Sequence, residues 1–189
     1  MKLYIKYMVS IRCKMVVKEE LLKLGLHHVI LSLGLVEVME DLSSEQREKL
    51  KIGLLQYGLE LMDDKKAILI EKIKNVIIEM IHYTDQLPKV NYSDYISEKL
   101  GHDYTNMSKI FSEVNGITIE KFIIAHKIER VKELLIYDEL NLTQISYILN
   151  YSSVSHLSQQ FKKVTGLTPR FFKQLKSEKR IALEKVGIV

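Results

Sequence analysis

The sequence has no tryptophan, two prolines and one cysteine, Cys13, in 189 residues. A single cysteine excludes a framework of internal disulfides, which suits a reducing compartment. No stretch approaches the roughly 18 consecutive apolar residues of a membrane span. Lys6, Arg12 and Lys14 interrupt the start, where a signal peptide needs an unbroken apolar stretch. We therefore expect a soluble cytoplasmic protein.

The short motifs of common enzyme classes are also missing. The chain has no phosphate-binding glycine loop, no nucleophile elbow and no H-E-x-x-H pair. Cys13 is the only support for catalysis, and the sequence identifies no base that would activate it. We expect a binding protein without a cofactor rather than an enzyme.

Positive charge gathers at the end of the chain. Lys and Arg number 28 against 24 Asp and Glu, but the net charge is −1 over 1–64, −1 over 65–141 and +6 over 142–189. Such an excess suits the binding of phosphates. For the basic tail, 177–189, a merely solvated end is an equal alternative.

Residues 141–173 have the pattern of two helices separated by a tight turn. Thr143 is expected to cap a first helix that ends near Leu149. Asn150 follows, and asparagine tolerates the left-handed backbone that often ends a helix. This arrangement predicts a helix-turn-helix.

The second helix of this pattern runs from about Ser153 to Thr165, capped by Ser152 or Ser153. Its apolar residues share one stripe that is expected to be buried: Leu157, Phe161 and Val164. The opposite face is polar and basic and carries Ser155, His156, Gln159, Lys162 and Lys163. Gly166 ends the helix, and Pro169 begins the next.

The pattern I-x-x-I-L-x-Y, followed by L-x-x-x-F-K-K-x-x-G-x-T-P-x-x-F, resembles the C-terminal signature of AraC/XylS-type transcription regulators. The resemblance covers 93–176. It implies an all-α domain of two helix-turn-helix units joined by a long helix, in a bacterial regulator whose partners are double-stranded DNA and, for an activator, RNA polymerase. The N-terminal part does not resemble the sugar-binding domain of the arabinose regulator, so no effector is implied.

An internal repeat supplies the second unit. Five residues, Phe111, Val114, Gly116, Thr118 and Phe122, recur 50 residues later as Phe161, Val164, Gly166, Thr168 and Phe172. All four phenylalanines are expected in the core. Between the copies, 119–136 has no glycine or proline and predicts one connecting helix of roughly 27 Å. That length approaches the roughly 34 Å between successive major-groove faces of DNA.

The candidate DNA contacts lie on the second helix of each unit, because recognition helices present their N-terminal half to base edges. Matching to the family motif implies Val154, Ser155 and Gln159 in the second unit and Thr105, Ser108 and Lys109 in the first. Their neighbours His156, Gln160 and Asn106 are further candidates, and Lys162 and Lys163 suit phosphates. Gln159 can pair with adenine, and Lys109 with guanine or a phosphate. For any one of these residues, a solvated helix face is the alternative.

The first 64 residues predict a different module. Alternating apolar residues indicate strands over 3–9, 28–33, 35–40 and 59–62. Amphipathic patterns indicate helices over 11–24 and 45–57. The order βαββαβ predicts a ferredoxin-like α+β module.

This module resembles a degenerate heavy-metal-associated domain. The segment Met8-Val9-Ser10-Ile11-Arg12-Cys13 is similar to the M-x-C-x-x-C loop of that family, with Ser10 in place of the first cysteine. Metal binding through Cys13 and Met8, in a metal-sensing regulator, is the minor alternative, since soft ions prefer two thiolates. We favour a degenerate module kept for ligand sensing or assembly. His27 and His28 are expected in a loop before a strand, with metal ligation as the minor alternative.

Residues 65–92 are expected to link the two parts. Asp63 to Lys66 marks the first boundary, and a helix over 67–83 follows. Its apolar residues Leu69, Ile73, Val76, Met80 and Tyr83 have the spacing of a two-helix contact. The helix either packs between the modules, which we favour, or forms a homodimer.

Overall fold

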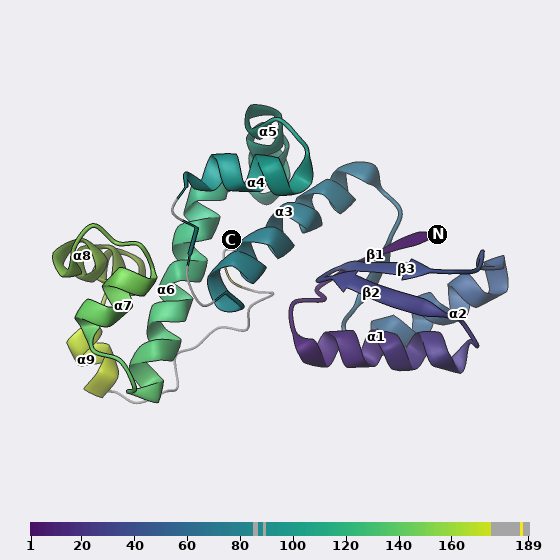
Figure 1. The fold of residues 1–189 in the computed structure, drawn as a ribbon, viewed down its shortest axis with the longest axis horizontal. Helices are drawn as coiled ribbons and strands as arrows, with labels where there is room; N and C mark the ends of the chain where they lie inside the picture. The colour runs from purple at the N-terminus through teal and green to yellow at the C-terminus, as the bar shows by residue number, and fades with distance from the viewer. Residues whose placement is uncertain (85–86, 89, 175–185, 187–189) are drawn as a thin grey trace. The chain divides into compact units, whose positions relative to one another are not determined.

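The computed structural model describes residues 1–84, 87–88, 90–174 and 186, which divide into two compact units (Figure 1). The units are Met1–Val76 and Ile77–Val189, and the division falls inside helix α3, Lys65–His82. Apart from Val186, the predicted basic tail 177–189 lies outside the described residues. Throughout the described parts, no helix has both the length and the apolar character needed to cross a membrane.

The N-terminal unit is a small antiparallel sheet with helices. Its elements are β1 (Lys2–Lys6), α1 (Ile11–Lys23), β2 (His28–Ser32), β3 (Leu35–Val38), α2 (Ser44–Gln56) and β4 (Glu60–Met62). The strands pair antiparallel in the order β2-β3-β1-β4. The four strands and two helices that the hydrophobic pattern predicts for this part of the chain are therefore present in the predicted sequence order.

The core of this unit lies between the sheet and the pair α1 and α2, which cover one face of it (Figure 1). Leu3 and Ile5 of β1 point into this core, whereas Tyr4 faces the other side of the sheet. There the Lys72 ammonium of α3 lies 4.5 Å from the Tyr4 ring centre. Alternation along β1 thus gives the strand two covered faces.

The first strand is shorter than the predicted 3–9. β1 ends at Lys6 because Tyr7 has a positive φ of 66°, which no extended strand can contain. The N–H of Val9 donates to the carbonyl of Tyr7 at 2.9 Å and closes this turn. Met8 then enters the core and is fully buried.

Helix α3 is buried along a stripe other than the predicted one. Ile73 and Met80 of the predicted stripe are buried, but Tyr83 is 46% exposed and Leu69 and Val76 are only half-buried. The buried positions instead include Ile70, Ile77, Ile78 and Ile81. These further apolar residues had indicated a helix covered on more than one side, which the burial confirms, but the spacing alone did not select the buried stripe.

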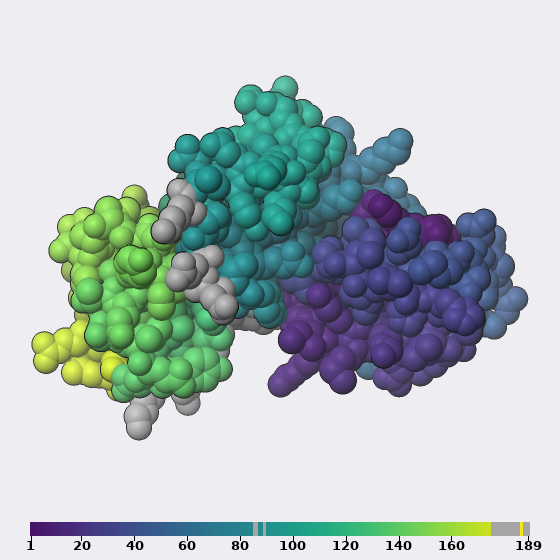
Figure 2. All heavy atoms as spheres, viewed as in Figure 1, coloured from purple at the N-terminus to yellow at the C-terminus, as the bar shows by residue number. Residues whose placement is uncertain are grey.

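The C-terminal unit is helical. After the end of α3 come α4 (Tyr92–Leu100), α5 (Tyr104–Asn115), α6 (Ile119–Tyr137), α7 (Leu142–Ile148), α8 (Val154–Thr165) and α9 (Pro169–Gln174). The second helices of the pairs α4–α5 and α7–α8 both contact the long helix α6, α7 contacts it as well, and α9 contacts α6 and α8. In Figure 2 the second pair with α9 forms a green and yellow lobe, and the first pair forms a teal one.

Helix α7 begins earlier than predicted and has a different cap. Asn141, not Thr143, is the N-cap: its side chain accepts from the N–H of Gln144, and the Gln144 side chain accepts from the N–H of Asn141, both at 2.9 Å. This reciprocal capping box satisfies two helix-end donors, whereas a cap at Thr143 would satisfy one. Thr143 lies in the first turn and is exposed.

Candidate nucleic-acid interface

Helix α5 is the second helix of the first pair and is fixed at both ends. The Asp103 side chain accepts from the N–H of Asn106 at 2.9 Å, and Gly116, with φ of 69°, ends the helix in the left-handed region. Met107 and Phe111 are fully buried. Of the predicted contacts on this helix, Thr105, Asn106 and Lys109 are exposed and Ser108 is half-buried.

Helix α8 repeats this construction in the second pair. The Ser153 side chain accepts from the N–H of His156 at 3.0 Å, and Gly166, with φ of 76°, ends the helix. Leu157 and Phe161 are fully buried. Among the predicted contacts, Ser155, His156, Gln159, Lys162 and Lys163 are exposed, and Val154 and Gln160 are half-buried.

Paired phenylalanine rings hold each unit to the helix that follows it. The Phe111 and Phe122 ring centres are 5.5 Å apart with an interplanar angle of 68°, and the Phe161 and Phe172 centres are 5.5 Å apart at 73°. Edge-to-face pairs of this kind stabilise beyond their buried area. All four rings are at most 3% exposed, which confirms their prediction as core.

Val164 is not part of the buried stripe that the sequence predicted, since it is 49% exposed. It lies in the last turn of α8, where the inward position is taken by Thr165. The Thr165 hydroxyl donates to the Phe161 carbonyl at 2.8 Å and accepts from the N–H of Leu167 at 3.1 Å. The end of the helix is therefore closed by hydrogen bonds rather than by apolar contact.

Two of the predicted contacts already have partners inside the domain. The Tyr151 hydroxyl donates to Oε1 of Gln160 at 2.7 Å, and Nδ1 of His156 lies 3.0 Å from the Ser152 hydroxyl. The Tyr151 and His156 rings also meet edge to face at 5.4 Å. Gln159 is exposed and has no hydrogen-bond partner among the described residues, so its amide is the better placed of the two glutamines to read a base.

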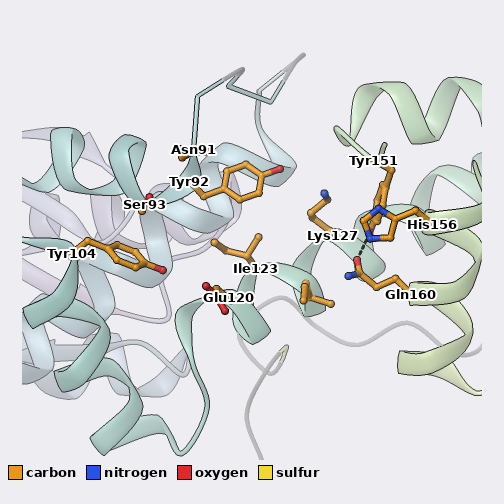
Figure 3. A pocket seen from close by; sticks show the side chains of 11 residues that line it. Asn91, Tyr92, Ser93, Tyr104, Glu120, Ile123, Lys127, Tyr151, His156 and Gln160 are labelled. Atoms are coloured by element: carbon orange, nitrogen blue, oxygen red, sulfur yellow. Dashed lines mark hydrogen bonds between the residues drawn. The ribbon is translucent and has the colours of Figure 1, made fainter. Parts of the chain in front are cut away.

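The sequence did not single out Lys127, although its surroundings are unusual. Lys127 lies on α6, is 6% exposed, and its ammonium lies 3.9 Å from the Tyr151 ring centre and 5.7 Å from that of Tyr92 (Figure 3). Burial lowers the pKa of Lys127 to about 8 and raises the pKa values of Tyr92 and Tyr151. The sequence signal that could have revealed this burial is the position of a lysine within the apolar pattern of 119–136.

The two candidate metal ligands, Cys13 and Met8, lie in different surroundings. The Cys13 thiol lies 3.2 Å from the Ser10 hydroxyl, and Met8 is fully buried in the core. His27 contacts Glu40, whereas Nδ1 of His28 faces the Leu26 carbonyl at 3.1 Å. No group of three His, Cys, Asp or Glu side chains comes together as metal ligands in the described residues.

The fold and the two capped, outward-facing helices define a domain of two helix-turn-helix units on a common helix. Residues 96–174 match the family described as "Helix-turn-helix domain", and they form such a domain of the AraC/XylS type. This match confirms the family resemblance inferred from the motif.

Two named regulators are similar to part of this chain. The xylose operon regulatory protein of Escherichia coli is 31% identical over 103 residues, 54% of this chain and 26% of that protein. The probable transcriptional regulator LumQ of Photobacterium leiognathi is 24% identical over 148 residues, 75% of this chain and 57% of that protein. The chain thus spans about a quarter of the first relative and somewhat over half of the second.

A solved structure agrees in fold. The C-terminal domain of AraT, a response regulator from Geobacillus stearothermophilus, is 19% identical, with a TM-score of 0.50 over 63% of this chain and 92% of that one. At this identity the likeness concerns the fold alone.

Proposed function

We propose that this chain is a sequence-specific DNA-binding regulator of transcription that places α5 and α8 in two successive major-groove faces of one duplex. The observation that supports it is the repeated unit, a capped helix with a buried phenylalanine stripe and an outward polar face, present twice on α6. The relatives are regulators by name, which agrees with this function. A binding function, without catalysis or cofactor, is part of the proposal.

The exposed residues of α8 divide into two roles. Gln159 lies in the middle of the helix and can bond the N6 and N7 edge of adenine. Lys162 and Lys163 lie in the last turn, suited to phosphates at the margin of the groove. Base preference should therefore depend on Gln159, and general affinity on the lysines.

The two helix-turn-helix units should contribute unequally to the affinity for DNA. The outward face of α8 has two lysines in its last turn, whereas the last turn of α5 has no basic residue and its Lys109 lies mid-helix. Because phosphate contacts supply most of the salt-dependent affinity, α8 should bind more strongly than α5. We infer an asymmetric operator with two base clusters about one helical turn apart.

The N-terminal unit is proposed to be a ferredoxin-like module that sets the oligomeric state or responds to a signal. Its strand order β2-β3-β1-β4, with α1 and α2 on one face, supports this fold. Contact with RNA polymerase and a cytoplasmic location remain part of the proposal, and dimerisation through 67–83 is the alternative to packing of this helix between the modules. Metal sensing gains no support, because the Met8 thioether is buried in the core.

The test is selection of bound sequences from a random duplex library, with the full chain and Gln159→Ala in parallel. The expected result is a site of two clusters about 10 base pairs apart, one of which loses its base preference in Gln159→Ala. Salt-sensitive binding without any enriched sequence would reject specific recognition by the chain alone.

A further inference from the structure

A pocket of about 410 Å³ lies between the two helix-turn-helix units, along α6 (Figure 3). Both helix-turn-helix units line the pocket. Tyr92 and Tyr104 come from the first of them, and Tyr151, His156 and Gln160 come from the second. Tyr104 directly precedes the predicted contact Thr105, and His156 and Gln160 flank Gln159. The pocket is therefore next to both candidate recognition surfaces.

Lys127 is the cation of this pocket. Its ammonium points between the rings of Tyr92 and Tyr151 in Figure 3, and none of the described carboxylates forms an ion pair with it. Tyrosine rings attract a cation but do not neutralise it. A buried, unneutralised charge is unfavourable for folding, so Lys127 is a candidate for binding an anion from outside.

The start of α4 opens on the same pocket and also favours an anion. Asn91 is the N-cap residue, but its side chain makes no capping hydrogen bond. In contrast, the side chains of Asp103, Thr118, Asn141 and Ser153 cap the helices α5 to α8. Among the described residues, no N-cap side chain therefore accepts from the first amides of α4, and such amides bind anions at helix N-termini.

No acidic side chain among the lining residues lies at the end of the pocket near Lys127. Glu120 lines the pocket, but it lies on the side of Tyr104, away from His156 (Figure 3). Asp94, in the first turn of α4, does not line the pocket. The end of the pocket near Lys127 thus has a positive character contributed by two separate elements.

We propose that this pocket binds one backbone phosphate of DNA, on the strand that passes from one recognition helix to the other. Lys127 and the first amides of α4 supply the charge and the donors. A duplex that places α5 and α8 in adjacent grooves must cross the space between them, and the first helix of such a motif normally crosses the backbone. This inference rests on the proposed DNA-binding function and adds a phosphate contact at the centre of the domain.

The test measures DNA affinity of the full chain against salt concentration for the wild type, Lys127→Met and Lys127→Arg. Lys51→Met is the matched control, since it removes the same charge from an exposed position on α2 of the other unit. Lys127→Met should lower the slope of log affinity against log salt by about 0.9 and weaken binding roughly tenfold on every sequence. Lys127→Arg should keep the slope, and Lys51→Met should leave both quantities unchanged.

Ethylation interference gives a second readout that a purely structural role would not change. One phosphate between the two base clusters should interfere with the wild type and lose its effect with Lys127→Met. Unfolding curves establish whether each variant is folded. If Lys127→Met is not, Lys127→Gln takes its place. An unchanged salt slope and interference pattern in the folded variant would overturn the proposal.

A titration with inorganic phosphate separates the two sources of a phosphate group. Amide shifts at Tyr92 and Ser93 that disappear in Lys127→Met, together with an unchanged DNA salt slope, would overturn the DNA assignment in favour of a free anion. Gln159→Ala is measured alongside. If it alters base preference while Lys127→Met has no effect, the DNA-binding function stands and only the inference about Lys127 fails.

Discussion

Nδ1 of His126 lies 3.2 Å from Nε2 of His82, and this contact joins α6 to the last turn of α3 within the C-terminal unit. His126 is fully buried, its ring is 4.4 Å from that of Phe122, and its Nε2 has no hydrogen-bond partner among the described residues. Burial first, and then the electrostatic effect of the nearby His82 ring, lower the pKa of His126 to about 3. The imidazole is therefore neutral in the folded protein at physiological pH.

Acid should destabilise the C-terminal unit through His126. The unfolded chain binds this proton near pH 6.5 and the folded one only near pH 3, so stability is lost as the pH falls below about 6.5. Between pH 7 and pH 5 the loss is about 2 kcal/mol. Urea unfolding at the two pH values measures it. His126→Leu should remove this part of the loss, and the exposed control His102→Ala should retain it. Equal losses in both variants would contradict the assignment to His126.

Phe161 should be essential for the stability of the second helix-turn-helix unit. Its ring is fully buried against Phe172, so Phe161→Ala removes an aromatic contact and leaves a cavity. The expected cost is about 3–5 kcal/mol. Phe171→Ala is the control, because that ring is 48% exposed. Thermal unfolding of the two variants compares them, and a similar fall for both would show that Phe161 is not a core residue in solution.

Gly34 and Gly25 separate backbone strain from steric overlap in the N-terminal unit. Both have positive φ, 72° and 69°, but a Cβ at Gly34 would lie 2.1 Å from Nδ2 of Asn75, whereas nothing lies within 4 Å at Gly25. Asn75 is buried and donates to the Leu33 carbonyl at 3.2 Å, so it cannot move freely. Gly25→Ala should cost roughly 1 kcal/mol and Gly34→Ala at least roughly twice that. Unfolding free energies that are equal for the two variants would exclude the Asn75 contact.

Gln159 and the two lysines of α8 should differ in what they change. Gln159→Ala should reduce discrimination at one base position by about 1–3 kcal/mol. Lys162→Ala or Lys163→Ala should weaken binding to all sequences and lower the salt slope by about 1. Competition binding on a selected site and its single-base variants measures both. Identical behaviour of the two classes of variant would refute this division of roles.

Lys127→Met should stabilise the fold while it weakens DNA binding. The folded-state pKa of about 8 lies below the usual 10.5, so the charged form disfavours folding, and the wild type should gain stability as the pH rises from 8 to 10.5. At pH 7 the substitution should raise the unfolding free energy by about 1–3 kcal/mol. Urea unfolding at pH 7 measures this, with Lys51→Met as the unaffected control. A destabilised Lys127→Met would mean that the ammonium is favourable where it lies.

Local patterns accounted for much of the fold. Ser153 as one of two candidate caps, Gly166 as a helix end and Asn150 in the left-handed region, with φ of 49°, were predicted because capping and turn formation depend on neighbouring residues. The wrong prediction of the α7 cap has the same local origin. Thr143 and Asn141 are both good caps, and only the reciprocal bond with Gln144 selects Asn141.

The sequence by itself determined the order of the elements and the repeated helix-turn-helix, because periodicity and a 50-residue recurrence are properties of the chain. Tertiary structure alone decided which side of α3 is buried, that Gln160 is held by Tyr151, and that Lys127 lies beneath two tyrosine rings. The physical reason is distance along the chain. Tyr92 and Tyr151 belong to different helix-turn-helix units and meet Lys127 only when both of these pack on α6, so no local pattern could reveal that the lysine is buried.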